Sequence, residues 1–102
     1  MGLLAPRSPA RPPRLAIAPN PGNPRAEISF ILAADVPVDL TVWSADGRRV
    51  RTLARGDTYG AGSHAVTWDG RDEGGRQAAS GAYLVRLRAD GRMTSGKLTL
   101  VR

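Results

Sequence analysis

The chain has 102 residues, which suits a single domain, and its formal net charge is +6. It has no cysteine, which excludes disulfides, thiolate zinc sites and a cysteine nucleophile. No apolar run approaches the roughly 20 residues that cross a bilayer, and the apolar start at residues 1–5 is too short for a signal peptide. We therefore expect no membrane span, and we expect any export signal to lie elsewhere in a longer precursor.

The positive charge is concentrated at the N-terminus. Residues 1–25 carry four arginines and no acid, whereas residues 26–102 carry eleven bases and nine acids. A basic leader can bind nucleic acid or an anionic surface, but a solvated linker with incidental arginines is the simpler interpretation. We expect no specific nucleic-acid binding.

Proline separates the leader from the folded part. Residues 1–14 are predicted to be an extended Pro/Arg-rich linker or arm, and residues 15–102 the domain itself. Residues 15–18 form a short apolar segment that the turn cluster Pro19-Asn20-Pro21-Gly22-Asn23-Pro24 ends. A strand bounded by prolines belongs at a sheet edge.

The rest of the domain alternates apolar and polar residues with the period of a β-strand. This pattern predicts strands at 26–32, 38–44, 49–53, 64–68, 83–88 and 93–101. Asp46-Gly47 and Asp90-Gly91 predict hairpin turns. The glycines in 56–62 predict a loop, and the polar segment 69–80 predicts a second one. No stretch has helical spacing, so the fold class is all-β, a sandwich of about seven antiparallel strands in two sheets.

The residues offer little for catalysis. His64 is the one histidine, and Ser63 beside it would point to the opposite face of the strand. We expect His64 to lie beside Val66 and Trp68 and to bond a carbonyl oxygen. The sequence therefore predicts a protein that is not an enzyme and that needs no cofactor.

An acidic cluster follows the strand at 64–68. Asp69, Asp72 and Glu73 could supply oxygen ligands for a weak calcium site. However, Arg71 and Arg76 lie in the same loop, and the ligand ladder of a dedicated calcium loop is absent. We favour a turn in which the Asp69 carboxylate accepts hydrogen bonds from backbone amides.

Two of the five aromatic residues fall outside the predicted inward faces. Phe30, Trp68 and Tyr83 are expected in the core. Trp43 shares its face with polar residues, and Tyr59 lies in the predicted glycine loop. Such an exposed pair could stack on a sugar or dock a protein, the alternative being packing under a loop or edge strand.

A series of sequence blocks occurs in a fixed order and covers about residues 15–102. It resembles the immunoglobulin-like domain of the flagellar hook-capping type, and is similar to the C-terminal sorting domain of type IX secretion cargo. That family often has an aromatic between its two Asn-Pro steps, where this chain has Gly22. The blocks are Ala18-Pro19-Asn20-Pro21-Gly22-Asn23-Pro24, Ile28-Ser29-Phe30-x-Leu32, Val42-Trp43-Ser44-x-Asp46-Gly47-Arg48-x-Val50, Gly62-x-His64-x-Val66-x-Trp68-Asp69-Gly70-Arg71-Asp72 and Ala79-Ser80-Gly81-x-Tyr83.

The resemblance implies an immunoglobulin-like module, extracellular or at the cell surface, at the C-terminus of a longer secreted bacterial protein. It implies no catalytic residues. We expect sorting, anchoring or assembly through a protein partner. We predict that an acidic partner meets the outward bases around the last hairpin, Arg86, Arg88, Arg92 and Lys97.

Two alternatives stay open at this stage. The chain could be a subunit or repeat of a filament, hook cap or adhesin, with Leu15 and Ile17 donated to a neighbour's sheet. It could also be a carbohydrate-binding module of a hydrolase, with a glycan on Trp43.

Overall fold

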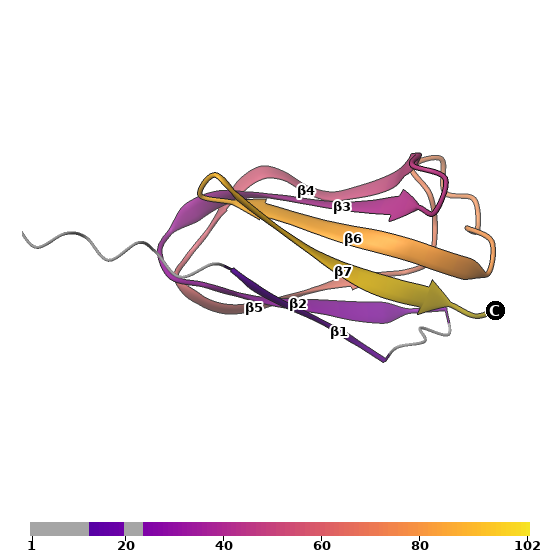
Figure 1. The fold of residues 1–102 in the computed structure, drawn as a ribbon, viewed down its shortest axis with the longest axis horizontal. Coiled ribbons are helices and arrows are strands. Elements are labelled where there is room, and N and C mark those ends of the chain that lie inside the picture. Colours follow the sequence, from indigo (N-terminus) through magenta and orange to yellow (C-terminus); the bar gives the residue numbers. More distant parts are fainter. Residues whose placement is uncertain (1–12, 20–23) are drawn as a thin grey trace, which may run out of the picture.

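The computed structural model describes residues 13–19 and 24–102 and places seven strands in two stacked sheets. Strands β1, β2 and β5 form the smaller sheet, and the larger sheet has the order β4-β3-β6-β7. Figure 1 shows the two layers, with every neighbouring pair antiparallel. The strands are β1 (Arg14–Ala18), β2 (Ala26–Leu32), β3 (Val36–Ser44), β4 (Arg49–Tyr59), β5 (Gly62–Trp68), β6 (Gly81–Ala89) and β7 (Arg92–Leu100).

The predicted inward faces form the core between the sheets. Alternate residues of β2, β3 and β6 are buried because successive side chains of a strand point to opposite faces. Trp68 is fully buried, and its ring meets Tyr83 edge to face at 5.4 Å between centroids. The Trp68 Nε1 donates to the Arg71 carbonyl at 2.9 Å, so the buried indole is satisfied. The prediction of an all-β sandwich is confirmed.

The predicted loop at 56–62 is wrong in most of its length. β4 continues to Tyr59, and the turn into β5 is confined to Gly60 and Ala61. Gly56 has a φ of 68° beside a register shift between β3 and β4, and its amide donates to Asp39 Oδ1 at 2.8 Å. The glycine thus serves a bulge inside a long strand, a role that is hard to tell from a loop in sequence.

The two Asp-Gly hairpins form as predicted, but with different turns. Asp90 and Gly91 both have positive φ, as a two-residue turn of type I′ requires. At the first hairpin only Gly47 has positive φ, and its amide donates to the Ser44 carbonyl at 3.0 Å. This is a three-residue connection, in which a type I turn precedes a left-handed glycine.

The edges of the two sheets meet along β1 and β7. Leu15 and Ile17 face the interior, and Gly96 lies so close that an added Cβ would be 3.1 Å from Ile17 Cδ1 and 3.2 Å from Leu15 Cδ2. The last residues of the predicted linker also join the fold, because β1 begins at Arg14 and the Pro13 carbonyl accepts from Thr94 Oγ1 at 3.1 Å. The remainder of that linker and the Asn-Pro steps around Gly22 lie outside the described residues.

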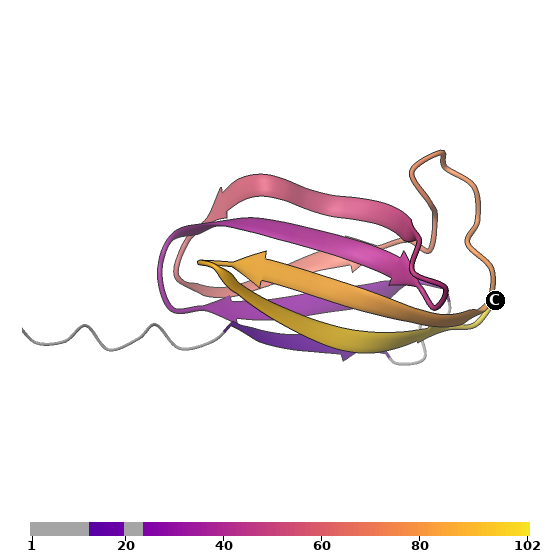
Figure 2. The same ribbon diagram turned by 45° about the horizontal axis from the view of Figure 1, so that its top comes forward.

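Figure 2 shows the segment between β5 and β6 rising from the end of the sandwich where the C-terminus lies. In the part of the chain that the structure describes, no helix is long and apolar enough to pass through a membrane.

Candidate functional site: the outer face of the larger sheet

The strand register arranges the outward side chains of the larger sheet in three rows. Each row crosses the sheet from β4 through β3 and β6 to β7. The alternate residues of β3 and β6 are buried on the core side of the sheet. Five members are cationic and only Asp39 is acidic. The rows are Arg49, Trp43, Leu84 and Lys97; Thr52, Thr41, Arg86 and Ser95; and Arg55, Asp39, Arg88 and Met93. We call this surface the outer face.

A tryptophan and an arginine contact each other at the centre of the outer face. The Arg86 guanidinium carbon lies 5.2 Å from the centroid of the Trp43 ring, a cation–π arrangement. The Trp43 Nε1 donates to Thr41 Oγ1 at 2.9 Å, which fixes the ring in its plane. Both Trp43 and Arg86 are half-buried. Because their rotamers are already restricted, little entropy is lost when a partner contacts them.

Two hollows flank this pair. The first, of about 310 Å³, is lined by four arginines with Asp39, Thr41 and Met93. The second, of about 440 Å³, is lined mainly by small and apolar residues, with Lys97 among the lining residues. Trp43 and Arg86 line both. The four arginines are Arg49, Arg55, Arg86 and Arg88, and the apolar lining of the second hollow includes Ala45, Ala82 and Leu84.

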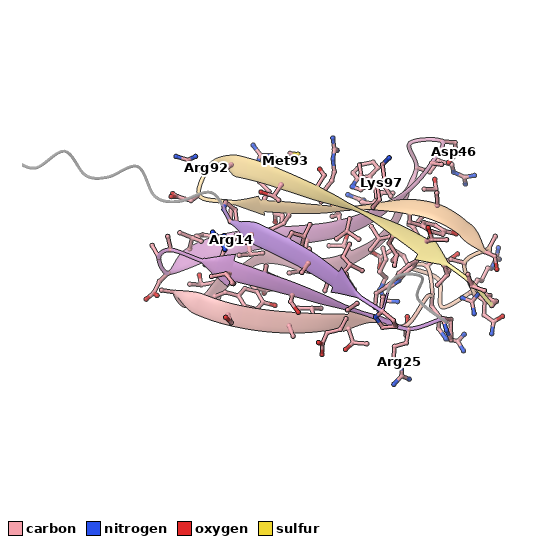
Figure 3. All side chains as sticks on the ribbon, turned by 60° about the horizontal axis from the view of Figure 1, so that its bottom comes forward. Arg14, Arg25, Asp46, Arg92, Met93 and Lys97 are labelled. Carbon is pink, nitrogen blue, oxygen red and sulfur yellow. The ribbon has the colours of Figure 1, made fainter. Side chains whose placement is uncertain are left out.

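The predicted partner residues divide between this face and other places. Arg86, Arg88 and Lys97 lie on it, and Figure 3 shows Lys97 and Met93 projecting on the side of β7 away from the smaller sheet. The expectation that Arg92 shares this face is wrong. Arg92 pairs with the buried Ala89 and has the strand parity of Leu98, so it belongs to the opposite side at the end of the hairpin.

Leu15 and Ile17 are not presented to a neighbour. Both are half-buried against the chain's own core, and β1 is hydrogen-bonded to β2 in its own sheet. Arg49 and Arg55, in contrast, belong to the outer face but were not predicted as site residues. The bulges between β3 and β4 decide which β4 residues share a side with Trp43, and no alternation in the sequence reveals those shifts.

Trp43 and Tyr59 do not form a platform, and the packing that the sequence left as the alternative holds for Tyr59. Tyr59 packs edge to face on Phe30 at 5.3 Å and on His64 at 5.0 Å, at the end of β3 opposite to Trp43. The stack on Arg86 also covers part of the Trp43 ring that a sugar would use. His64 bonds the Gly60 carbonyl through Nε2 at 2.6 Å, which confirms its predicted carbonyl partner.

The acidic cluster serves the loop after β5. Asp69 Oδ1 accepts from the Arg71 amide at 3.0 Å, so the predicted turn is confirmed. Asp72 Oδ1 accepts from the amides of Gly74 and Arg76, both at 2.9 Å. Among the described residues, no three His, Cys, Asp or Glu side chains are grouped so that they could hold a metal ion.

Arg51 connects that cluster to the larger sheet. Its guanidinium lies 3.7 Å from Asp69 Oδ1 and 4.0 Å from Glu73 Oε1, and Glu73 Oε2 accepts from the Thr52 amide at 2.6 Å. Nearby, a hydrogen bond from the Ser44 hydroxyl lowers the pKa of Asp46. Asp69 and Glu73 thus connect the loop after β5 to the larger sheet, whereas Asp46 accepts within its own hairpin.

A family model matches this chain over most of the domain. The family described as the FlgD Ig-like domain matches residues 20–92. The basal-body rod modification protein FlgD of Salmonella typhimurium, and that of Salmonella typhi, are each 40% identical to this chain over 52 residues. The aligned part covers 51% of this chain but only 22% of those relatives.

Solved structures share the fold at low sequence identity. Dimeric latent PorU from Porphyromonas gingivalis aligns with a TM-score of 0.77 and 20% identity, over 97% of this chain and 10% of that one. PorZ, a surface component of the type IX secretion system of the same organism, aligns at 0.55 and 14% identity, over 86% and 11%. The DNA glycosylase AlkC of Pseudomonas fluorescens, solved with DNA bound, aligns at 0.54 and 19%, over 89% and 30%. At these identities the likeness concerns the sandwich itself.

Proposed function

This chain belongs to the FlgD Ig-like domain family, and from that premise we propose that it is a non-catalytic docking module. It joins the protein that carries it to a protein assembly outside the cell or at the cell surface, and so serves sorting or anchoring. The observation that carries the proposal is the outer face, where Trp43 and Arg86 are held between two hollows. Tryptophan and arginine are the side chains most enriched at the energetic centres of protein interfaces.

The relatives support an assembly role of this kind. FlgD is by its name a basal-body rod modification protein, and PorZ is by its description an essential bacterial surface component of the type IX secretion system. A small module that binds protein and catalyses no reaction would suit assemblies of this kind. The same reasoning supports an extracellular or surface location for this chain.

The proposal is tested with a reporter enzyme fused in front of the full chain in a bacterium that has type IX secretion. We expect the reporter at the cell surface, measured by its digestion with protease added to intact cells. Met93→Asp on the outer face should lower the surface fraction, whereas Ile31→Asp on the smaller sheet should not. The two residues are a matched pair, since Met93 is 51% exposed and Ile31 46%. Equal delivery with both variants, or delivery without the chain, contradicts the proposal.

A second candidate is a structural subunit of an extracellular assembly, which the match to FlgD favours. In that case copies of the chain would associate with each other, and β1 would be a natural strand to exchange. Because β1 is already paired with β2 and packed beside Gly96, exchange would first have to remove it. Sedimentation that stays monomeric up to millimolar concentration would contradict this candidate.

A further inference from the structure

The cationic hollow of the outer face carries an excess of positive charge, with four arginines in its lining. Its one carboxylate, Asp39, accepts from the Gly56 amide at 2.8 Å. The ion pairs that Arg51 makes with Asp69 and Glu73 lie outside the hollow. Four arginines therefore face one carboxylate, and an anionic partner would gain from neutralising the excess positive charge.

Two buried polar atoms of this hollow have no hydrogen-bond partner. They are the Nε of Arg86 and the Oγ1 of Thr52, which lie in the same row of the outer face. Most buried donors and acceptors in folded proteins are paired, so this unpaired set is unusual. Both atoms are covered by the chain itself, so a partner would contact the remainder of the half-buried Arg86 guanidinium. A carboxylate suits the arginines of this hollow, because its two oxygens can accept from the fork of a guanidinium.

The neighbouring hollow has a different chemistry. Its lining of Trp43, Leu84 and Ala82 is mainly apolar, and it shares Trp43 and Arg86 with the cationic hollow. A ligand that covers both must carry negative charge and a bulky apolar group a few ångströms apart. A polypeptide with acidic residues around an aromatic or large aliphatic one meets both demands.

A nucleic acid fits this pair of hollows less well. Its bases need an open aromatic face for stacking, but the Trp43 ring is already stacked with Arg86. Its backbone would also have to fill the apolar hollow with phosphate and sugar. The combination of charge and apolar lining thus favours protein over nucleic acid.

We propose that the partner of the outer face is an acidic protein segment whose carboxylates bind Arg49, Arg86 and Arg88 while one bulky apolar side chain enters the hollow beside Trp43 and Leu84. This inference rests on the proposed function, to which it adds the chemistry of the partner. It predicts affinity that falls with salt, because solvent-exposed charges of the partner and the outer face are screened.

The test measures binding of the full chain to defined peptides by fluorescence anisotropy. The probe is a labelled decapeptide of glutamates around one phenylalanine, compared with versions that have alanine for the phenylalanine or lysines for the glutamates. A single-stranded ten-nucleotide DNA is the probe for the other class of partner. The chain variants are R49E/R88E on the outer face and R14E/R25E on the smaller-sheet side, which change the net charge equally; Figure 3 labels Arg14 and Arg25 on that side.

We expect R49E/R88E to weaken binding of the acidic peptide at least about tenfold, and R14E/R25E to change it less than about twofold. Loss of the phenylalanine should weaken binding about fivefold, and the lysine peptide should not bind. Circular dichroism confirms that each variant folds. The inference is overturned if both double variants weaken binding equally, if the phenylalanine has no effect, or if the DNA binds more tightly than the peptide.

The failure of this inference is distinguishable from the failure of the proposed function. Surface delivery that depends on Met93 without any binding of the acidic peptide keeps the docking module and overturns the acidic partner. Peptide binding that depends on Arg49 and Arg88, without delivery of the reporter, supports the partner chemistry and contradicts the sorting role.

Discussion

Replacing Gly70 by alanine tests the packing of the Trp-Asp-Gly turn, with Gly75→Ala as the matched control. Both glycines lie between β5 and β6, with nearly the same φ of 78° and 82°. An added Cβ at Gly70 would lie 3.0 Å from the Pro24 carbonyl oxygen and 3.3 Å from Pro24 Cβ, whereas at Gly75 it would meet nothing within 4 Å. The pair therefore separates the effect of backbone conformation from that of close approach.

The magnitudes follow from these two terms. A left-handed residue with a side chain costs about 1–2 kcal/mol, which the reduced freedom of the unfolded chain offsets by up to about 1 kcal/mol. Crowding against backbone adds about 1–3 kcal/mol. We expect Gly75→Ala to lower the free energy of unfolding by about 1 kcal/mol and Gly70→Ala by about 2–4 kcal/mol.

The assay is urea unfolding of the full chain, monitored by tryptophan fluorescence. The slope of the free energy of unfolding against urea concentration should be the same for each variant, so that a shift of the midpoint reports stability. Arg102 Nη2 would also lie 3.0 Å from the added Cβ, and this group donates to the Gly70 carbonyl. Repeating Gly70→Ala in an Arg102→Ala background separates that flexible contact from the backbone one. Equal losses for Gly70→Ala and Gly75→Ala refute the close approach of Pro24.

Four further predictions address other parts of the molecule. Gly96→Val should push Leu15 and Ile17 away from β7, lower the free energy of unfolding by about 1–3 kcal/mol and speed proteolysis near β1, whereas Ser95→Val on the outer face should do neither. Burial raises the pKa of Tyr83, whose hydroxyl donates to the Ala79 carbonyl at 2.6 Å. The contribution of Tyr83 to the free energy of unfolding is therefore complete below about pH 10, where the tyrosine of the unfolded chain ionises. It is lost as the pH rises through the higher pKa of the folded state. Melting temperatures should therefore fall over this pH range, and should fall less in Tyr83→Phe. Arg51→Ala should cost about 1 kcal/mol by freeing the loop after β5, with Arg55→Ala within about 0.5 kcal/mol of no effect, as compared by urea unfolding. Calcium should leave the melting temperature unchanged, because the carboxylates of Asp69 and Asp72 already accept hydrogen bonds from backbone amides. A rise in the melting temperature with calcium would contradict this and support a calcium site.

Sequence reasoning predicted the fold well where one face of a strand is buried. Ile28, Phe30 and Leu32, for example, alternate with polar residues because that strand has one side in the core. β4 was predicted short, since Gly56 and the bulges interrupt its pattern without ending its hydrogen bonds to β3. Local alternation cannot show such a shift, because the partner strand supplies the pairing that holds a bulge in place.

The candidate site was predictable only in part, for the same reason. Arg86, Arg88, Lys97 and Trp43 alternate with buried residues, so their outward direction followed from the sequence. Arg49 and Arg55 lie on the outer face because of the register of β4. Arg86 lies over Trp43 because β3 pairs with β6. These relations between strands come from the fold as a whole.

Photo-crosslinking in intact cells tests the docking surface most directly. Benzoylphenylalanine is introduced at Ser95 on the outer face, or at Ala65 on the outside of the smaller sheet, in the protein that carries this chain. Both are small, exposed strand residues. We predict a protein adduct from position 95 that is lost in R49E/R88E, and none from position 65. Adducts from position 65 alone, or equal adducts from both positions, would contradict docking through the outer face.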